Sequence, residues 1–174
     1  ALLHATENGR WRVMCDTSPC LARMRKTLDS RLALFEPVEF TFRFLAERLE
    51  FRQKYGCIAV HATCSTRAMG LTDELLAVAG RCSREVVLPD GIFCCGFSGD
   101  RGFSHPELNA AALAGLKEQV KNCQAAFSTS RTCEVGLTLH GSLPYRNILY
   151  LVDECSVPRA SGPSGTGISG PSAA

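Results

Sequence analysis

The sequence GIFCCGFSGDRGF at residues 91–103 places two adjacent cysteines in a glycine-rich turn, between a predicted strand and a predicted helix. Neighbouring side chains diverge on regular backbone and a disulfide between them is strained, so Cys94 and Cys95 favour an external partner. Soft thiolate ligands select zinc or an iron–sulfur cluster. Glycines in the turn allow positive φ and close backbone approach. The turn therefore predicts a loop that supplies two sulfur ligands to one centre.

Predicted strands and helices alternate on both sides of this turn. The apolar runs Cys57–Thr63, Glu85–Leu88 and Ala125–Thr129 are typical of buried strands, and Trp11–Asp16 predicts a shorter one. Alternation of this kind predicts an α/β fold of parallel βαβ units. In such sheets ligands bind beyond the carboxyl ends of the strands, so we expect the cysteine loops there.

The predicted helices carry apolar stripes at spacings of three and four residues. Thr72 and the capping box from Ser104 to Glu107 mark two helix starts, and Gly141 fits just beyond a helix end. For Ile148–Val152, periodicity does not decide whether the segment is a last strand or the start of a last helix. The two N-terminal stripes are Leu21, Met24, Leu28 and Leu32, and, after Pro37, Val38, Phe42, Leu45 and Leu49.

Five of the ten cysteines follow a predicted strand within a few residues, so one edge of the sheet should gather them. Helix N-termini at that edge should lower their thiol pKa and favour thiolate ligands. The candidate metal ligands are Cys64, Cys94, Cys95, Cys133 and Cys20. The other five lie in strands or on apolar helix faces, where cysteine behaves as a small hydrophobe: Cys15, Cys57, Cys82, Cys123 and Cys155.

Two arginines lie in the cysteine loops, where positive charge would offset thiolates or sulfides. Arg67 and Arg101 are therefore candidate cofactor-binding residues, although a salt bridge with Asp100 or Glu107 would explain Arg101 equally well. His61 and His105 lack the spacing of a metal pair or of a nucleophile's base, so we expect structural roles for them. We identify no catalytic residue.

Composition limits the classes of partner and compartment. The chain is 45% hydrophobic with a net charge of +2 and scattered basic residues, which gives no electrostatic reason to expect nucleic acid as a partner. No signal segment opens the sequence, and the longest apolar run, Ile148–Val152, is too short to span a bilayer. We expect a reducing, cytoplasmic location, with any membrane association peripheral on the inner face.

The strand, turn, cysteine and helix at residues 11–25 weakly repeat at residues 125–137. We therefore expect residues 1–50 to end a first module and residues 51–155 to form a second. Residues 156–174 are almost wholly Ser, Gly, Pro and Ala with hardly any large apolar side chain, and predict a disordered tail. The chain lacks an initiator Met and begins in mid-pattern, so we expect it to be the C-terminal piece of a longer protein.

In the second module 29 residues separate Cys64 from Cys94, and 37 separate Cys95 from Cys133. This signature resembles the cysteine-rich CCG domain shared by heterodisulfide reductases and anaerobic glycerol-3-phosphate dehydrogenases. The segments HATCSTRAMGL (61–71), CCGFSGDRGFSHPELNAAAL (94–113), STSRTCEVGL (128–137) and PYRNILYLVDEC (144–155) are most similar to the C-terminal region of FAD-linked D-lactate dehydrogenases. The resemblance covers about residues 11–155. The family pattern closes with Cys-x-x-Cys, whereas this chain has Gly136 at the last place.

The resemblance implies an electron-transfer domain of a D-2-hydroxyacid dehydrogenase that holds or borders an iron–sulfur centre, of the 4Fe–4S type in the family's fullest form. An FAD domain elsewhere in the full-length chain or complex would oxidise the hydroxy acid, and a quinone or cytochrome would accept the electrons. The present residues alone should not be active. The rival interpretation is a non-catalytic docking module stabilised by zinc or by a cluster. Thiol–disulfide chemistry at Cys94 and Cys95 is a third, less favoured because Cys-x-x-Cys is missing.

Overall fold

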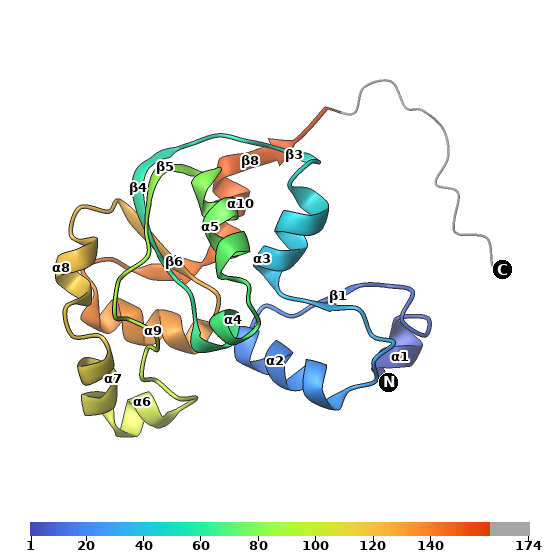
Figure 1. Ribbon diagram of the computed structural model, residues 1–174, viewed down its shortest axis with the longest axis horizontal. Coiled ribbons are helices and arrows are strands. Elements are labelled where there is room, and N and C mark those ends of the chain that lie inside the picture. The colour runs from blue at the N-terminus through green and yellow to red at the C-terminus, as the bar shows by residue number, and fades with distance from the viewer. Residues whose placement is uncertain (161–174) are drawn as a thin grey trace.

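The computed structural model describes residues 1–160 and is built around a four-stranded parallel sheet (Figure 1). The strand order is β5–β4–β6–β7, and the central pair is in register with Ile58 opposite Ala125. The predicted α/β class with parallel βαβ units is confirmed. The strands are β4 (Tyr55–His61), β5 (Ser83–Val87), β6 (Ala125–Ser128) and β7 (Tyr145–Asn147).

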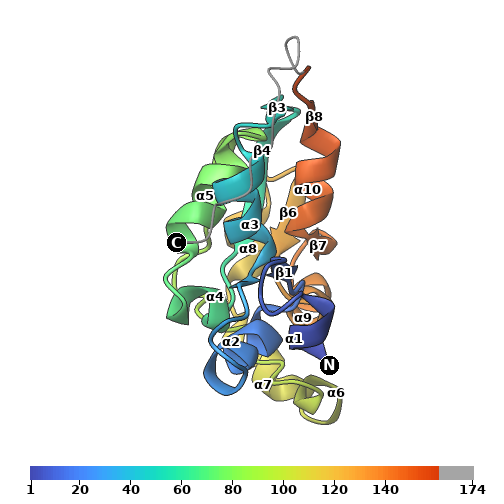
Figure 2. The ribbon, with the colours of Figure 1, turned by 90° about the vertical axis from the view of Figure 1, so that its right-hand side faces the viewer.

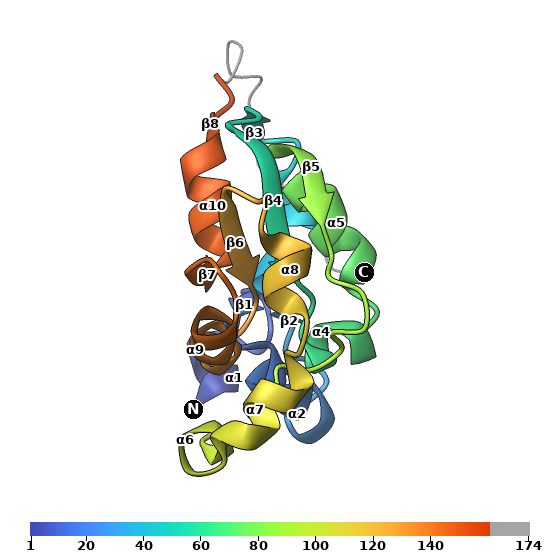
Figure 3. The ribbon, with the colours of Figure 1, turned by 90° about the vertical axis from the view of Figure 1, so that its left-hand side faces the viewer.

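Helices cover both faces of the sheet because β4 and β6 are apolar on both sides. Ile58 and Phe127 pack under α3 (Pro37–Phe40), α5 (Thr72–Gly80) and α10 (Ile148–Cys155), which lie together in Figure 2. Ala59 and Ala126 point the other way, to the side that α8 (Leu116–Val120) and α9 (Arg131–His140) cover in Figure 3. The alternating side chains of the strands thus produce three layers with a separate apolar core on each face.

The N-terminal part adds a smaller unit with its own core of Leu21, Leu32 and Leu34. The strand predicted at residues 11–16 is only two residues long. The prediction that Leu28 continues the apolar stripe of the following helix is wrong. The helix ends at Thr27, and Leu28 is extended and 40% exposed. Its elements are α1 (Leu2–Ala5), β1 (Val13–Met14), α2 (Ser18–Thr27) and β2 (Leu34–Phe35), with β1 and β2 parallel.

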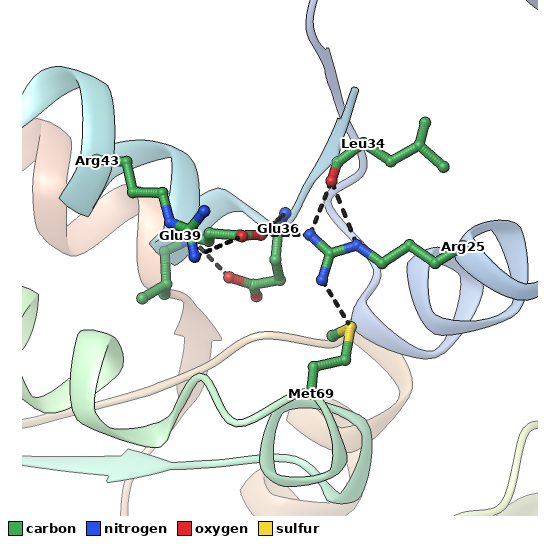
Figure 4. Close-up of polar contacts among 7 residues, drawn as sticks. Arg25, Leu34, Glu36, Glu39, Arg43 and Met69 are labelled. Carbon is green, nitrogen blue, oxygen red and sulfur yellow. Dashed lines mark hydrogen bonds and ion pairs between the residues drawn. The ribbon is translucent and has the colours of Figure 1, made fainter. Parts of the chain in front are cut away.

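An ion-pair cluster joins this unit to the sheet (Figure 4). The Arg25 guanidinium from α2 donates to the Leu34 carbonyl at 2.7 Å and to Glu39 of α3 at 2.5 Å. It also lies 3.6 Å from the Met69 sulfur, just after α4 (Cys64–Ala68). Glu39 pairs with Arg43 as well. Because Val38 of α3 lies in the same core as the sheet, the first 50 residues pack directly on the second module.

The stripe predicted from Val38 to Leu49 is only partly correct. The helix α3 continues as the π-helix η1 (Thr41–Leu45), and Leu49 instead opens β3 (Leu49–Phe51). This strand pairs antiparallel with β8 (Ser156–Pro158) at the top of Figure 1. The disordered tail predicted from Ser156 therefore begins too early, because residues 156–158 hydrogen-bond to β3. Residues 161–174 of that tail lie outside the described residues.

Two helix starts also differ from the sequence prediction. The helix α7 (Pro106–Ala112) begins after His105, and the Ser104 hydroxyl donates to the carbonyl of Arg101 in α6 (Arg101–Ser104) instead of capping α7. Thr72 is the first residue of α5 and not its cap. Gly141 follows α9 as predicted, and Ile148–Val152 begins a helix. No helix within residues 1–160 has the length and apolar character that a bilayer crossing requires.

Candidate metal centre

Three cysteine-bearing segments meet at the carboxyl edge of the sheet, at the bottom of Figure 1. Cys64 begins α4 three residues after β4, where the Thr63 hydroxyl accepts a hydrogen bond from the amide of Thr66. Cys94 and Cys95 lie in the loop between β5 and α6, and Cys133 lies in the first turn of α9 after β6. Parallel strands end at one edge, so residues far apart in sequence come together there.

The structure places two of the four candidate sulfur ligands of the second module in direct contact. Cys95 and Cys133 lie 2.9 Å apart, both buried, with 3% and 6% of their surfaces exposed. Cys64 and Cys94 are exposed and follow β4 and β5 at the same edge of the sheet. The Cys94 sulfur also accepts a hydrogen bond from the Gly96 amide at 3.3 Å. Two buried and two accessible thiols thus form one group.

The thiol pKa values correct the expectation that helix N-termini would lower all of them. The sulfur–sulfur hydrogen bond between Cys95 and Cys133, supported by the Phe97 amide, lowers the pKa of Cys95 to about 7. The same hydrogen bond, together with burial, raises the pKa of Cys133, because one proton is held between the two sulfurs. Burial and the neighbouring Cys94 raise the pKa of Cys64. Desolvation and nearby sulfur outweigh the helix dipole at these two positions.

Asn109, which the sequence analysis did not identify, positions the Cys95 loop. It is 1% exposed in α7, and its amide donates to the Cys95 carbonyl. The turn brings Gly96 against α7 with φ +71°, and a Cβ there would lie 2.6 Å from the Leu108 carbonyl. A polar residue beside the apolar Leu108 was the only sequence signal for Asn109.

The Asn109 side-chain amide leaves no room for a metal-ligating side chain at position 136. A Cβ at Gly136 would lie 2.5 Å from the Asn109 Nδ2 and 3.0 Å from the Phe97 ring. The departure from Cys-x-x-Cys noted in the sequence therefore has a packing reason. Asn109 and Phe97 occupy the space that a fifth cysteine would need.

A buried group of hydroxyls lies beneath the cysteines and holds the N-terminal unit in place. The Ser18 hydroxyl, at the start of α2, lies 2.8 Å from those of Thr63 and Ser65, and Thr66 lies 2.8 Å from Thr129. All five side chains are buried. The Ser and Thr residues directly after β4 and β6 were visible in the sequence, but their partner in α2 was not.

The side chains of Cys20, Arg67 and Arg101 form no hydrogen bond with the four thiols in the described part of the chain. Cys20 is exposed on α2 and makes no sulfur–sulfur hydrogen bond within residues 1–160. Arg67 donates to the Ala62 carbonyl and lies 5.3 Å from the Phe93 ring, next to Cys94. Neither Arg67 nor Arg101 forms an ion pair in the described part of the chain, where Glu107 instead pairs with His105.

His61, at the end of β4, has the structural environment that the sequence predicted. Its ring is 1% exposed, with Nδ1 3.4 Å from the Ser128 hydroxyl and Nε2 without a partner within residues 1–160. Burial, with a smaller contribution from the Arg67 charge, lowers the pKa of His61 to about 4. The imidazole is therefore neutral at pH 7.

The thiol group fits a soft metal by its donor chemistry, although its present geometry is that of hydrogen-bonded thiols. Within residues 1–160, no group of three or more His, Cys, Asp or Glu side chains is placed so that it could hold a metal ion. Two thiolates on one tetrahedral metal lie about 3.8 Å apart, from Zn–S bonds of about 2.3 Å. The sulfurs of Cys95 and Cys133, at 2.9 Å, would have to separate to bind.

Comparison of the chain with models of protein families, with curated proteins and with solved structures gave no match.

Proposed function

We propose that this chain is the cysteine-rich electron-transfer domain of an FAD-dependent D-2-hydroxyacid dehydrogenase, of the D-lactate type. The observation that carries the proposal is the group of four thiols, Cys64, Cys94, Cys95 and Cys133, at one edge of a parallel sheet. These residues would hold an iron–sulfur centre, which supplies one-electron transfer when bound. The spacing of the four cysteines and the sequence resemblance support this class over others.

Protein groups around the thiols would set the properties of such a centre. The Gly96 amide donates to the Cys94 sulfur, and hydrogen bonds of this kind raise the reduction potential of a ligated cluster. Arg67 lies beside Phe93, and its charge would act in the same direction. Phe93 and Phe103 are 62% and 73% exposed on either side of the cysteine loop, which gives an apolar surface for a redox partner.

The partners follow from the same proposal. An FAD-binding domain of the full-length chain or complex would deliver electrons, and a quinone or cytochrome would accept them, in the cytoplasm or at the inner face of its membrane. No residue set in the described chain combines a flavin site with a base beside a carboxylate pocket. We therefore expect the 174 residues alone, supplied with free FAD, not to oxidise D-lactate with a dye acceptor.

The second candidate is a zinc-stabilised docking module. The observation that favours it is the donor count, because Gly136 cannot be replaced by a ligand and four thiols make the Cys₄ set of a structural zinc site. In that case the metal would stabilise the fold without transferring electrons.

Metal analysis of the chain purified without oxygen tests the proposal. We expect iron and acid-labile sulfide, a brown colour and visible absorption, whereas a colourless protein containing one zinc would support the docking module instead. Replacing any one of Cys64, Cys94, Cys95 or Cys133 by Ser should remove most of the metal and destabilise the domain, since metal binding is coupled to folding. Matched controls are Cys82→Ala and Cys155→Ala, because these cysteines are buried at the other end of the sheet.

Cys20→Ser is the intermediate case, because it reports whether the first module contributes a ligand. Equal metal content in the variants of the thiol group and in the controls would contradict a shared centre.

A further inference from the structure

Sulfur atoms also meet at the opposite, amino edge of the sheet. Cys57, in β4, and Cys123, two residues before β6, have their Sγ atoms 3.2 Å apart. The sequence pattern predicts both as separate small hydrophobes of the apolar core. They are 66 positions apart in the chain, so only the pairing of β4 with β6 brings them together.

The backbone fixes both cysteines in this position. The Gln124 amide donates to the Cys57 carbonyl at 2.9 Å. The Gln124 side-chain oxygen in turn accepts from the amide of Gly56 at 2.5 Å. A disulfide needs Cβ atoms on neighbouring, fixed segments and an S–S bond of about 2.05 Å, so a small movement of the sulfurs is enough.

Solvent exposure distinguishes Cys57 and Cys123 from Cys82 and Cys155, the other cysteine pair of the core. Cys57 is partly exposed and Cys123 is 7% exposed, whereas Cys82 and Cys155, which also lie beside each other, are 0% and 1% exposed. Burial and the Cys57 thiol raise the pKa of Cys123 to about 12, so Cys123 stays protonated. Cys57 is therefore the sulfur that meets a dissolved oxidant.

We propose that Cys57 and Cys123 form a reversible disulfide when the protein meets a peroxide. The Cys57 thiolate attacks one peroxide oxygen, the O–O bond breaks, and water leaves, so that Cys57 carries a sulfenic acid. The Cys123 sulfur then attacks that sulfur and the S–S bond forms, while the S–O bond of the sulfenic acid breaks and the Cys123 proton leaves with the hydroxyl group as a second water. Two thiols and one hydrogen peroxide thus give one disulfide and two waters, and a dithiol reductant reverses the change.

The disulfide would be a reversible covalent cross-link between β4 and the segment that enters β6, away from the thiol group at the carboxyl edge. It does not depend on which metal that group binds. Because the bond closes a loop of about 66 residues, oxidation should raise the thermal midpoint of the domain by about 5–10 °C.

The test uses the whole 174-residue chain, purified without oxygen and treated with a small excess of hydrogen peroxide. After free thiols are alkylated, a non-reducing peptide map should show the Cys57 and Cys123 peptides linked, with a mass loss of about 2 Da that dithiothreitol reverses. Cys57→Ser and Cys123→Ser should each abolish the link, while Cys82→Ala should retain it.

The Cys82 and Cys155 peptides are the internal control for an intact fold, because their thiols should become accessible to the alkylating reagent only after denaturation. The proposal is overturned if the Cys57 and Cys123 peptides stay unlinked, if Cys57 is instead oxidised to sulfinic acid, or if the Cys82 and Cys155 peptides link equally fast.

Discussion

The two edges of the sheet hold similar atoms and differ in what surrounds them. Each edge has a pair of sulfurs in contact, Cys95 with Cys133 at 2.9 Å and Cys57 with Cys123 at 3.2 Å. Each also has a side-chain amide bonded to the backbone beside a cysteine. At the carboxyl edge helices begin, further thiols converge, and the amide is buried. At the amino edge no third thiol is hydrogen-bonded to Cys57 and Cys123 within residues 1–160, and the amide of Gln124 is exposed.

The comparison shows that position in a parallel sheet, more than residue type, decides what a cysteine does. The strands β4, β5 and β6 all end at the carboxyl edge. The loops that follow them begin there, so thiols from three segments gather at that edge. At the other edge the chain enters the strands, and the sulfurs of Cys57 and Cys123 meet between the neighbouring strands β4 and β6. The first arrangement suits a metal and the second suits a disulfide.

The largest effect we expect concerns the buried His61 of the carboxyl edge. Its pKa of about 4 in the folded state lies below its usual value of 6.5, so the unfolded chain binds more protons between these pH values. The free energy of unfolding should therefore rise by about 3 kcal/mol as the pH rises from 4 to 6.5, and be lost as the pH falls through that range.

The titration of Glu36 changes the free energy of unfolding in the opposite direction, so the contribution of His61 is measured in a variant without the Glu36 carboxyl. Burial raises the pKa of Glu36 to about 7, so its contribution is fully present below its usual 4.5 and is lost as the pH rises towards 7. In urea unfolding between pH 4 and 7, the free energy of unfolding should rise more steeply with pH in Glu36→Gln than in the natural protein. An unchanged profile in that variant would contradict the neutral, buried state of His61.

The next effect compares the two amides. Asn109→Ala should destabilise the domain by about 2 kcal/mol, because the buried Cys95 carbonyl loses its partner. Gln124→Ala should cost about 0.5 kcal/mol, since water replaces an exposed acceptor at the Gly56 amide. Chemical denaturation of both variants measures the difference, and equal losses would remove the distinction between the edges.

A third test adds a single methyl group at two helical glycines. Gly136→Ala should destabilise by about 1.5 kcal/mol, because its Cβ overlaps the Asn109 amide. Gly80→Ala, in α5, has nothing within 4 Å of its Cβ and should be neutral or stabilising by up to about 1 kcal/mol. Combining Gly136→Ala with Asn109→Ala should relieve the overlap, so the double variant should be more stable than the sum of the single losses.

The smallest effect concerns the short ladder of β3 and β8. A chain that ends at Cys155 loses β8 and its pairing with β3, and should be less stable than a chain that ends at Ala160 by about 1 kcal/mol. Thermal midpoints of the two truncated proteins measure this. Identical midpoints would mean that the ladder contributes nothing to the folded state.

Local sequence patterns were sufficient for three of the four strands of the sheet, and missed the short edge strand β7. The apolar runs at residues 57–63, 85–88 and 125–129 gave β4, β5 and β6, because fully buried parallel strands need continuous apolar, β-branched residues. The same alternation predicted the cysteine edge. The predictions were wrong where two local interactions compete for one side chain. At Ser104, for example, the hydroxyl donates to the Arg101 carbonyl instead of capping α7.

By itself, then, the sequence determined the α/β class and the edge at which Cys64, Cys94, Cys95 and Cys133 gather, since strand order along the chain and loop position carry that information. Only the tertiary structure decided that Asn109 fills the space beside Gly136 and that β8 pairs with β3. It also decided that Cys57 meets Cys123 across 66 positions. These contacts depend on the register of neighbouring strands and on how helices pack, which no local periodicity encodes.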